Sequence, residues 1–267
     1  MSLFYLLLLA VIQGITEFLP VSSSGHLALL PALTGAQDQG QFIDVAVHIG
    51  TLGAVVLYFW ADVKSAFFGA LRLITGKIDT DGAKLALLLI VATIPVVIIG
   101  FILKLTGLSD AMRSIKVIGW AMLIFGIVLY WADQKGAQTK VQSDWNLPDA
   151  IKLGLWQAVA LIPGTSRSGI TITGARQMGY TREDGAKIAM LMSIPTIIAS
   201  GVLLGLDVAK SADWAMAKDG AIAAVFAFAA ALLALSLMMK LLKSVSFTPY
   251  VIYRVVLGIA LLAYAYA

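Results

Sequence analysis

Long apolar stretches dominate this sequence and limit what it can fold into. A helix needs about 20 mostly apolar residues to cross the hydrocarbon core of a bilayer, and six stretches come near that length. They cover residues 44–61, 84–103, 115–132, 186–206, 220–240 and 249–267. Only 13% of the 267 residues are charged, which is about half the share of a soluble domain. We therefore predict an all-α polytopic membrane protein with six transmembrane helices.

Four further apolar runs are too short to cross a bilayer. They cover residues 3–12, 27–33, 153–163 and 170–175. The first two flank QGITEFLPVSSSGH (13–26), and the last two flank GTSRSG (164–169). Such broken, polar backbone is tolerated at membrane depth only where protein buries it or a wet cavity surrounds it. The pattern predicts two re-entrant helical hairpins, and paired broken segments also mark a binding site near the membrane midplane.

The two hairpins match each other in sequence. Ser22–Gly25 (SSSG) and Ser166–Gly169 (SRSG) lie 144 positions apart. Each half of the chain would then hold one hairpin and three spans, and because three is an odd number, the second half would be inverted relative to the first. We predict one membrane domain over residues 1–267, with repeat halves at about 1–132 and 150–267. A chance match within a sequence of low diversity is the alternative.

Lysine and arginine fall unequally on the two ends of the predicted spans. The end that holds both termini carries five, namely Lys104, Arg113, Lys116, Lys210 and Lys218. The opposite end carries twelve, namely Lys64, Arg72, Lys77, Lys84, Lys135, Lys140, Lys152, Arg176, Arg182, Lys187, Lys240 and Lys243. Because cytoplasmic loops are enriched in Lys and Arg, we predict that both termini face outward. No basic run interleaved with aromatic residues indicates a nucleic-acid partner.

The first hairpin places a carboxylate between apolar runs. Ionisable groups at membrane depth usually face a cavity or a partner, which applies to Glu17. Gln13 precedes Glu17 by four residues, so the two share one face of a helix and could together bind a divalent cation or hold a proton or an imidazole. With no cysteine and only two histidines in the chain, a thiolate or His-rich metal centre is not expected. The alternative is a shallow hairpin in which Glu17 is merely interfacial.

Three serines and a histidine follow the carboxylate. Ser22, Ser23 and Ser24 precede His26, and serine is a favoured N-cap. A helix N-terminus offers free amide hydrogens and a positive dipole end to a phosphate. A histidine three residues from a serine can accept the serine proton and so activate the hydroxyl as a nucleophile. His48 has no polar cluster beside it in sequence, which favours a packing role; a supporting role behind the site residues is the alternative.

The second hairpin centres on Arg167 in PGTSRSGIT (163–171). An arginine fork matches phosphate oxygens, and a Gly-containing turn can present backbone N–H groups to an anion. A lipid-headgroup anchor is the alternative role for Arg167. Arg254 lies about five residues into the last predicted span, where it either snorkels to the membrane edge or reaches the site as a second anion clamp. One hairpin offers an acid, hydroxyls and a base and the other an oxyanion cradle, which together suit phosphoryl transfer on a lipid-borne phosphate.

These motifs are similar to those of a known family. The sequence resembles the bacitracin-resistance family of undecaprenyl-diphosphate phosphatases, whose first motif, (E/Q)xxxE followed by FLPVSS(S/T)GH, appears here as QGITEFLPVSSSGH (13–26). The family's second motif, PGxSRSxxT, appears as PGTSRSGIT (163–171). DVAVHIGTLGAVV (44–56) and IYR (252–254) are also similar, so the resemblance covers essentially the whole chain. Glutamine at position 13 leaves Glu17 as the only carboxylate of the first motif.

The resemblance implies a phosphatase of the bacterial inner membrane. It would hydrolyse undecaprenyl diphosphate to undecaprenyl phosphate and phosphate, recycle the lipid carrier of peptidoglycan synthesis and confer resistance to bacitracin. It implies a catalytic site that faces outward and a divalent cation, Mg²⁺ or Ca²⁺, which we expect near Gln13 and Glu17. Carried over by position, the catalytic residues are Glu17, Ser23, His26 and Arg167. The phosphate-binding residues are Gln13, Ser22, Ser24, Gly164, Ser166, Ser168, Thr171 and Arg254.

The expected mechanism starts with the diphosphate held by Arg167 and nearby amides. Ser23, deprotonated by His26, would attack the terminal phosphorus, and water would then release phosphate. His26 as the nucleophile, or as the base for a direct attack by water, are alternatives. A transporter or flippase for the lipid phosphate is the alternative function, because broken helices at the midplane are also typical of transporters. Polyprenyl diphosphate and the bilayer are the expected partners, and a homodimer is left open.

Overall fold

The computed structural model describes residues 2–35, 39–108, 112–208 and 214–267, and Lys210 lies outside these ranges. The described residues form helices and loops, with one isolated β-bridge between Lys140 and Tyr180. The first part of the chain holds α1 (Leu3–Phe18), α2 (Ser23–Thr34), α3 (Gly40–Tyr58), α4 (Trp60–Ile74), α5 (Asp81–Thr106) and α7 (Ile115–Lys135). The second part holds the short 3-10 helices η1 (Gln142–Asp144) and η2 (Val159–Leu161), with α8 (Leu147–Ala158), α9 (Arg167–Gln177), α10 (Arg182–Val208), α11 (Trp214–Leu241) and α12 (Thr248–Tyr266).

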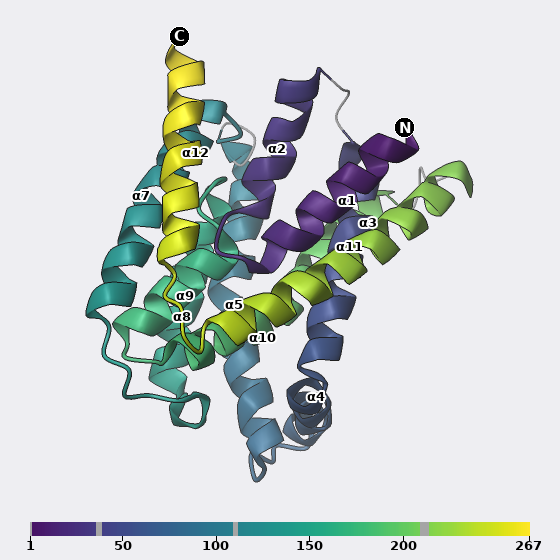
Figure 1. Cartoon of the computed structure of the whole chain (residues 1–267). Coiled ribbons are helices and arrows are strands. Elements are labelled where there is room, and N and C mark those ends of the chain that lie inside the picture. Colours follow the sequence, from purple (N-terminus) through teal and green to yellow (C-terminus); the bar gives the residue numbers. More distant parts are fainter. Residues whose placement is uncertain (1, 36–38, 109–111, 209–213) are drawn as a thin grey trace.

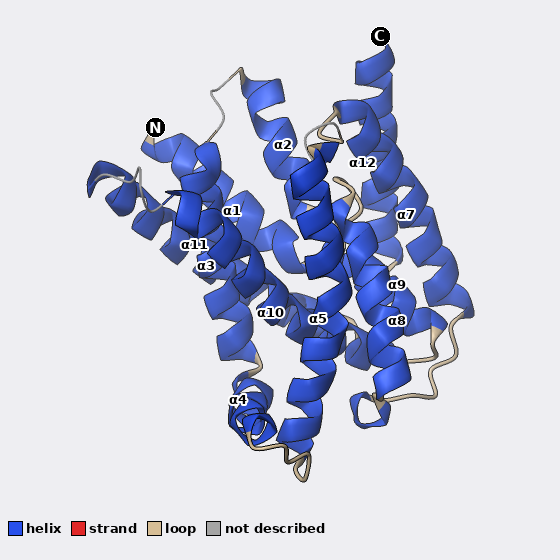
Figure 2. Ribbon diagram, turned by 180° about the vertical axis from the view of Figure 1, so that it is seen from behind, coloured by secondary structure: helices blue, strands red, loops and turns tan. Residues whose placement is uncertain are grey.

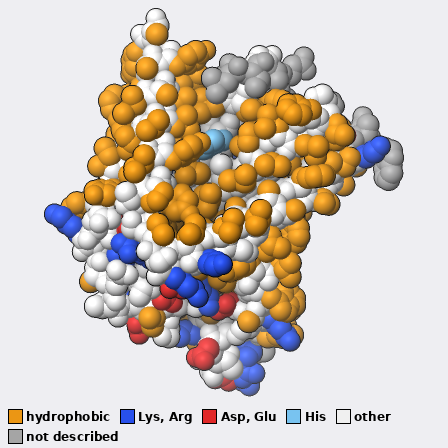
Figure 3. Space-filling view, viewed as in Figure 1, with side chains coloured by type: hydrophobic (Ala, Val, Ile, Leu, Met, Phe, Trp, Pro, Cys, Tyr) orange, Lys and Arg blue, Asp and Glu red, His pale blue; other side chains and the backbone are white. Residues whose placement is uncertain are grey.

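Six of the described helices are long and apolar enough to cross a membrane, which confirms the six predicted spans. They are α3, α5, α7, α10, α11 and α12. The N- and C-terminal marks lie at the same end of the molecule (Figure 1). Hydrophobic side chains cover the flank seen in Figure 3, whereas charged side chains gather mainly at the end opposite the termini. An apolar surface of this extent marks a face that contacts lipid.

The two short helix pairs lie among these long helices. α1 has 16 residues and α2 has 12, and a turn at residues 19–22 joins them. α8 has 12 residues and α9 has 11, with η2 and residues 162–166 between them. α1 is longer than the apolar run 3–12 because the helix continues through Gln13 and Glu17, whose side chains are buried.

Each short pair packs on a long helix from the other part of the chain. α1 packs on α11, and α8 packs on α5, which crosses most of the molecule's height (Figure 2). Glycines permit close approach at both contacts: a Cβ added at Gly14 would lie 2.6 Å from the carbonyl oxygen of Ala227, and one at Gly154 would lie 2.6 Å from that of Ala92. Side chains larger than hydrogen at these two positions would push the helices apart, so glycine fixes the depth at which α1 and α8 sit.

Helix α4 is an element that the sequence analysis did not anticipate. Its small and polar side packs on α5, where a Cβ added at Gly82 would lie 2.6 Å from the hydroxyl oxygen of Ser65. Its exposed apolar side chains are Trp60, Phe67, Phe68, Leu71 and Ile74. The hydrophobic side of α4 therefore faces away from the protein, which reverses the pattern of a soluble amphipathic helix and is typical of a helix that lies along a membrane surface.

The start of α8 is held by a buried carboxylate. Asp149 accepts hydrogen bonds from Lys140 Nζ at 2.9 Å and from the Tyr180 hydroxyl at 2.7 Å. Burial alone would raise the pKa of Asp149, but these two hydrogen bonds and the charge of Lys140 outweigh it and hold the pKa below its usual value. Burial and the neighbouring carboxylate raise the pKa of Tyr180. At neutral pH, an ionised Asp149 therefore anchors the second short pair to the loop that precedes it.

A second buried carboxylate, Asp133, joins four helices at the end opposite the termini. Its Oδ1 lies 3.1 Å from Arg176 Nε at the end of α9 and 2.8 Å from Arg182 Nε at the start of α10. Its Oδ2 accepts the backbone N–H of Phe247, the residue before α12, at 3.1 Å. Arg176 is fully buried and also donates to the carbonyl oxygens of Asp133, Gly136, Ala137 and Tyr180.

We predict that Asp133→Ala lowers the free energy of unfolding by about 3–5 kcal/mol, because removing one partner of a buried ion pair leaves the other charge uncompensated. The measurement is denaturant or thermal unfolding of the purified protein in detergent. Asp79→Ala is the matched control, since Asp79 pairs with Arg72 at the exposed surface, where ion pairs contribute little. Equal stability of the two variants would contradict the prediction.

Candidate active site

The turns of both short pairs end in a serine with left-handed backbone. Ser22 has a φ of 73° and Ser166 a φ of 70°, and no other non-glycine residue in the described ranges has a positive φ. Each serine is an N-cap: Ser22 Oγ accepts the N–H of Gly25 at 3.3 Å, and Ser166 Oγ accepts that of Gly169 at 3.2 Å. Such backbone costs about 1–3 kcal/mol and persists only where its surroundings enforce it. The two serines with this backbone are 144 positions apart, which is the offset at which the two hairpins match in sequence.

The helices that these caps begin meet at one carboxylate. Ser23 is the first residue of α2 and Arg167 the first of α9. Ser23 Oγ donates to Glu17 Oε2 at 2.6 Å, and Arg167 Nη2 donates to Glu17 Oε1 at 2.5 Å. Glu17 itself is buried near the end of α1. Three of the four expected catalytic residues thus share one cluster, although their separations in sequence are as large as 150 positions.

Two further side chains reach Glu17. Gln13 Nε2 donates to Glu17 Oε2 at 2.8 Å, which confirms that the two share a helix face. His48 of α3 places Nε2 at 3.8 Å from the same oxygen, while its Nδ1 lies 2.7 Å from the carbonyl oxygen of Asp44. The packing role expected for His48 is therefore incomplete, because its ring borders the carboxylate. No sequence signal beside His48 pointed to this, since the contact arises from the packing of α3 against α1.

Unsatisfied donors surround the same cluster. Arg167 Nη1 is buried and has no hydrogen-bond partner among the described residues. The Ser166 hydroxyl accepts the N–H of Gly169, and the Ser166 carbonyl oxygen accepts the N–H of Ile170. The amides at the very start of α9, and likewise of α2, have no partner in the described part of the chain and, with two helix dipoles, form a site for an anion.

His26 makes no hydrogen bond to Ser23 in the described structure. Its Nδ1 lies 2.7 Å from the carbonyl oxygen of Ser22, and its Nε2 lies 2.5 Å from the hydroxyl oxygen of Tyr253 on α12. Ser23 instead donates to a carboxylate, and a hydrogen bond to a charged acceptor is stronger than one to a neutral ring. The geometry thus differs from the expected Ser23–His26 pair. Tyr253 was missed, although it lies in the segment IYR that the sequence analysis singled out.

Arg254 neither snorkels nor projects freely into the site. It is fully buried and donates to carbonyl oxygens of both turns: Nη1 lies 3.4 Å from Pro20 O, and Nη2 lies 3.2 Å from Gly164 O and 2.8 Å from Thr165 O. Nη2 also lies 3.4 Å from the carbonyl oxygen of Ala121 on α7. The guanidinium therefore clamps the two turns together by their backbones.

The remaining expected binding residues lie around the second turn, except for Ser24, which lies beside the first. Gly164 has a φ of 90°, and a Cβ there would lie 2.6 Å from the carbonyl oxygen of Ile118, so glycine is required by backbone and space. Ser168 Oγ donates to the carbonyl oxygen of Leu19 at 3.0 Å and links the two turns. Ser24 Oγ lies 3.4 Å from Ser22 Oγ, and the buried Thr171 hydroxyl has no partner within the described ranges. Phosphate binding by these residues stays a prediction.

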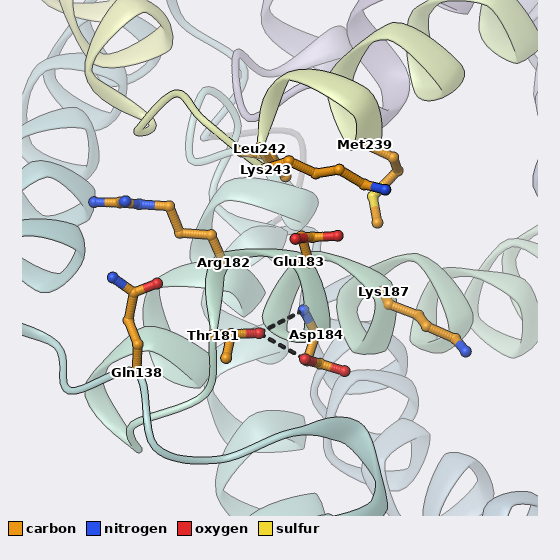
Figure 4. A pocket seen from close by; sticks show the side chains of 9 residues that line it. All are labelled: Gln138, Thr181, Arg182, Glu183, Asp184, Lys187, Met239, Leu242 and Lys243. Atoms are coloured by element: carbon orange, nitrogen blue, oxygen red, sulfur yellow. Dashed lines mark hydrogen bonds between the residues drawn. The ribbon is translucent and has the colours of Figure 1, made fainter.

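A pocket of about 420 Å³ lies apart from this cluster, at the start of α10 and the end of α11. Its charged side chains diverge: Arg182 and Lys187 point to opposite sides, and Lys243 passes over Glu183 (Figure 4). Arg182 is paired with Asp133 and Lys187 with Asp62 at 2.8 Å. We therefore assign the chemistry to the Glu17 cluster and not to this pocket.

Comparisons with known proteins bear on this cluster. The family model of "Bacitracin resistance protein BacA" matches residues 6–260. The chain belongs to this family. It is 73% identical over 267 residues to an undecaprenyl-diphosphatase of Ruegeria pomeroyi and 69% identical over 267 residues to one of Jannaschia sp., with full coverage of both chains in each case. It is 47% identical over 272 residues to undecaprenyl-diphosphatase 1 of Rhodospirillum rubrum, covering 100% of this chain and 96% of that one.

We predict that Arg254→Lys lowers stability and activity together, because a single ammonium nitrogen cannot reproduce the spacing of Nη1 and Nη2, which donate to carbonyl oxygens of different turns. Arg254→Ala should do so more strongly, since buried carbonyl oxygens left without a donor cost about 1–3 kcal/mol. Unfolding in detergent and enzymatic turnover measure the two effects. A fully stable, fully active Arg254→Ala variant would contradict the clamp.

Proposed function

We propose that this protein hydrolyses undecaprenyl diphosphate to undecaprenyl phosphate and inorganic phosphate. The names of its full-length relatives support this reaction, and they do not favour the transporter alternative. The observation that carries the proposal is the convergence of two capped helix N-termini on Glu17 and Arg167, where Arg167 Nη1 is buried without a partner in the described ranges. An anion with several oxygens satisfies these donors.

Substrate binding follows from the free donors. The terminal phosphate lies between the starts of α2 and α9 and accepts hydrogen bonds from Arg167 and the first amides of both helices. Arg167 is already oriented by Glu17, so little side-chain entropy is lost when the anion binds. The donors stay fixed while charge develops on the phosphoryl oxygens, and this is how a preorganised site lowers the barrier to transfer.

Ser23 is the proposed nucleophile and Glu17 its base. Ser23 Oγ forms a bond to the terminal phosphorus while the bond from phosphorus to the bridging oxygen breaks and undecaprenyl phosphate leaves. The Ser23 proton moves to Glu17 Oε2, which already accepts it in a hydrogen bond of 2.6 Å. Water then hydrolyses the phosphoserine. This assignment replaces His26 by Glu17 as the base for the first step, because no hydrogen bond joins His26 to Ser23 in the described part of the structure.

A divalent cation fits beside Glu17 only together with the substrate. No group of three His, Cys, Asp or Glu side chains suited to a metal occurs among the described residues. The Gln13 Oε1 atom, however, is buried next to Glu17 and has no partner within the described ranges. Mg²⁺ is often held by one or two carboxylates plus substrate phosphates, so we propose that Gln13 and Glu17 hold Mg²⁺ or Ca²⁺, which when bound would neutralise diphosphate charge.

The proposed setting is the bacterial inner membrane, with both termini and the site facing outward. The excess of Lys and Arg at the end opposite the termini supports this orientation. We further propose that the short pairs are re-entrant hairpins of an inverted repeat. The matched Ser22 and Ser166 caps support the repeat, and so does the reciprocal packing of α1 on α11 and α8 on α5. In this setting the enzyme would recycle the lipid carrier of peptidoglycan synthesis.

We predict that detergent-purified protein releases phosphate from a prenyl diphosphate, and that Arg167→Ala lowers kcat by about 100- to 1,000-fold, as loss of an oxyanion donor does. Glu17→Gln should also lower kcat, because the amide keeps the size of the side chain and removes the base. Arg72→Ala, far from the cluster, is the control. No release by the wild type, or release unaffected by both site variants, would contradict the phosphatase; lipid movement in proteoliposomes without hydrolysis would favour the transporter.

We predict that Gln13→Glu lowers the Mg²⁺ concentration needed for half-maximal activity, because a second carboxylate raises the affinity of an oxygen site for a divalent cation. Gln13→Met, of similar size but without an oxygen ligand, should raise it. The same order should appear in the Mg²⁺-dependent increase in melting temperature measured with a non-hydrolysable diphosphate present, a readout that does not depend on turnover. An identical Mg²⁺ response in both variants would remove Gln13 from the proposed cation site.

A further inference from the structure

The contact between His26 and Tyr253 joins α2 to α12 at the edge of the candidate site. The two rings stack with centroids 5.7 Å apart and planes 7° apart. Nε2 of His26 lies 2.5 Å from the Tyr253 hydroxyl oxygen, and Nδ1 lies 2.7 Å from the carbonyl oxygen of Ser22. Both nitrogens of one imidazole are therefore occupied by the protein.

These two contacts define which nitrogen carries the proton. A carbonyl oxygen can only accept a hydrogen bond, so Nδ1 of the neutral ring is the protonated nitrogen. Nε2 then holds a lone pair, and the Tyr253 hydroxyl donates to it. His26 is thus prepared as a proton acceptor, and because Tyr253 occupies its lone pair, a proton reaches Nε2 through the Tyr253 hydroxyl.

The pair stands between the cluster and the lipid-facing surface. Arg254, the next residue on α12, is fully buried, whereas Tyr253 is 45% exposed and Ile252 and Val256 are exposed as well. Ser23 and His26 are three residues apart on α2 and share a face of that helix, so the pair is within reach of water that approaches a phosphate on Ser23.

We propose that Tyr253 is a proton-relay residue that acts with His26 in the hydrolysis of the phosphoserine, a role that rests on the proposed phosphatase function. The water oxygen forms a bond to phosphorus while the bond from phosphorus to Ser23 Oγ breaks. The water proton moves to the Tyr253 oxygen as the Tyr253 proton moves to His26 Nε2. The proton held by Glu17 since the first step returns to Ser23, and His26 afterwards releases its proton to solvent.

This assignment gives the two bases separate steps. Glu17 takes the Ser23 proton in the first step, for which the contact of 2.6 Å already exists. His26, which makes no hydrogen bond to Ser23 in the described structure, takes the water proton in the second. Loss of the Tyr253 hydroxyl should therefore slow the second step alone and leave phosphate on the protein, which a merely structural role of Tyr253 would not do.

The test is Tyr253→Phe, which removes the hydroxyl and keeps the stacked ring. We expect kcat to fall on the order of 10-fold or more and KM to fall with it, because slowing the second step alone leaves kcat/KM unchanged. With substrate labelled in its terminal phosphate, more label should remain on the acid-quenched protein than in the wild type. Tyr264→Phe, on the same helix and without a hydrogen bond to any described residue, is the matched control and should behave as the wild type.

A second comparison asks whether Tyr253 acts through His26. In a His26→Gln background, Tyr253→Phe should cause no further loss, because two residues of one relay are not additive. An equal loss in both backgrounds would overturn the relay. So would an unchanged kcat in Tyr253→Phe, or a lower kcat without retained label.

The contact itself is tested by ¹⁵N NMR of histidine-labelled protein, with His48→Gln to assign the signals. We expect a protonated Nδ1 and an unprotonated Nε2 for His26, and a shift of the Nε2 resonance in Tyr253→Phe. An unchanged Nε2 resonance would overturn the relay alone. A wild type that binds substrate but releases no phosphate would overturn the phosphatase function, and the relay with it, whatever the spectrum shows.

Discussion

The buried ion pair between Glu17 and Arg167 is the interaction on which the rest of the structure depends. Each charge would be very costly alone among apolar helices, and each is tolerable only because the other is in contact with it. Glu17 belongs to the first short pair and Arg167 to the second, so the two pairs must meet for either charge to be buried. This constraint explains why polar sequence interrupts apolar runs at two distant places in the chain and nowhere else to the same extent.

Around this pair, many of the hydrogen bonds are made by backbone groups. Arg254 donates to carbonyl oxygens and not to a carboxylate, and two serines cap the helices that begin at the site. Glu17 is the one carboxylate among the contacts of this cluster in the described residues. It pairs with Arg167, while Arg254 binds the backbone of the two turns. The cluster therefore carries a net positive charge before any ligand arrives, as a site for a diphosphate requires.

Much of this arrangement could be predicted from the sequence. Apolar length gave the six spans, and the i, i+4 spacing gave the contact between Gln13 and Glu17. The contacts that could not be predicted all depend on packing between distant helices. His48 and Tyr253 lie in segments similar to the family's, but nothing local in the sequence gave either of them a contact. The preference of Ser23 for Glu17 over His26 follows from the direction of side chains at the start of α2. Helix α4 was missed because most of it lies beyond the predicted span 44–61 and its charged residues Asp62, Lys64 and Arg72 excluded it from the predicted spans.

The last helix, α12, supplies contacts that hold the site residues of the first motif in place. Glu17, Ser23 and His26 all lie within the first 26 residues, yet Tyr253 and Arg254, which contact His26 and the two strained turns, come from α12. A growing chain therefore inserts the acid, the hydroxyl and the imidazole long before it inserts the groups that hold them in place. Until α12 is inserted, the turns that contain Ser22 and Ser166 lack the hydrogen bonds from Arg254 that hold them together. A chain that stops short of α12 would keep both motifs and lose the Arg254 clamp and the Tyr253 contact together.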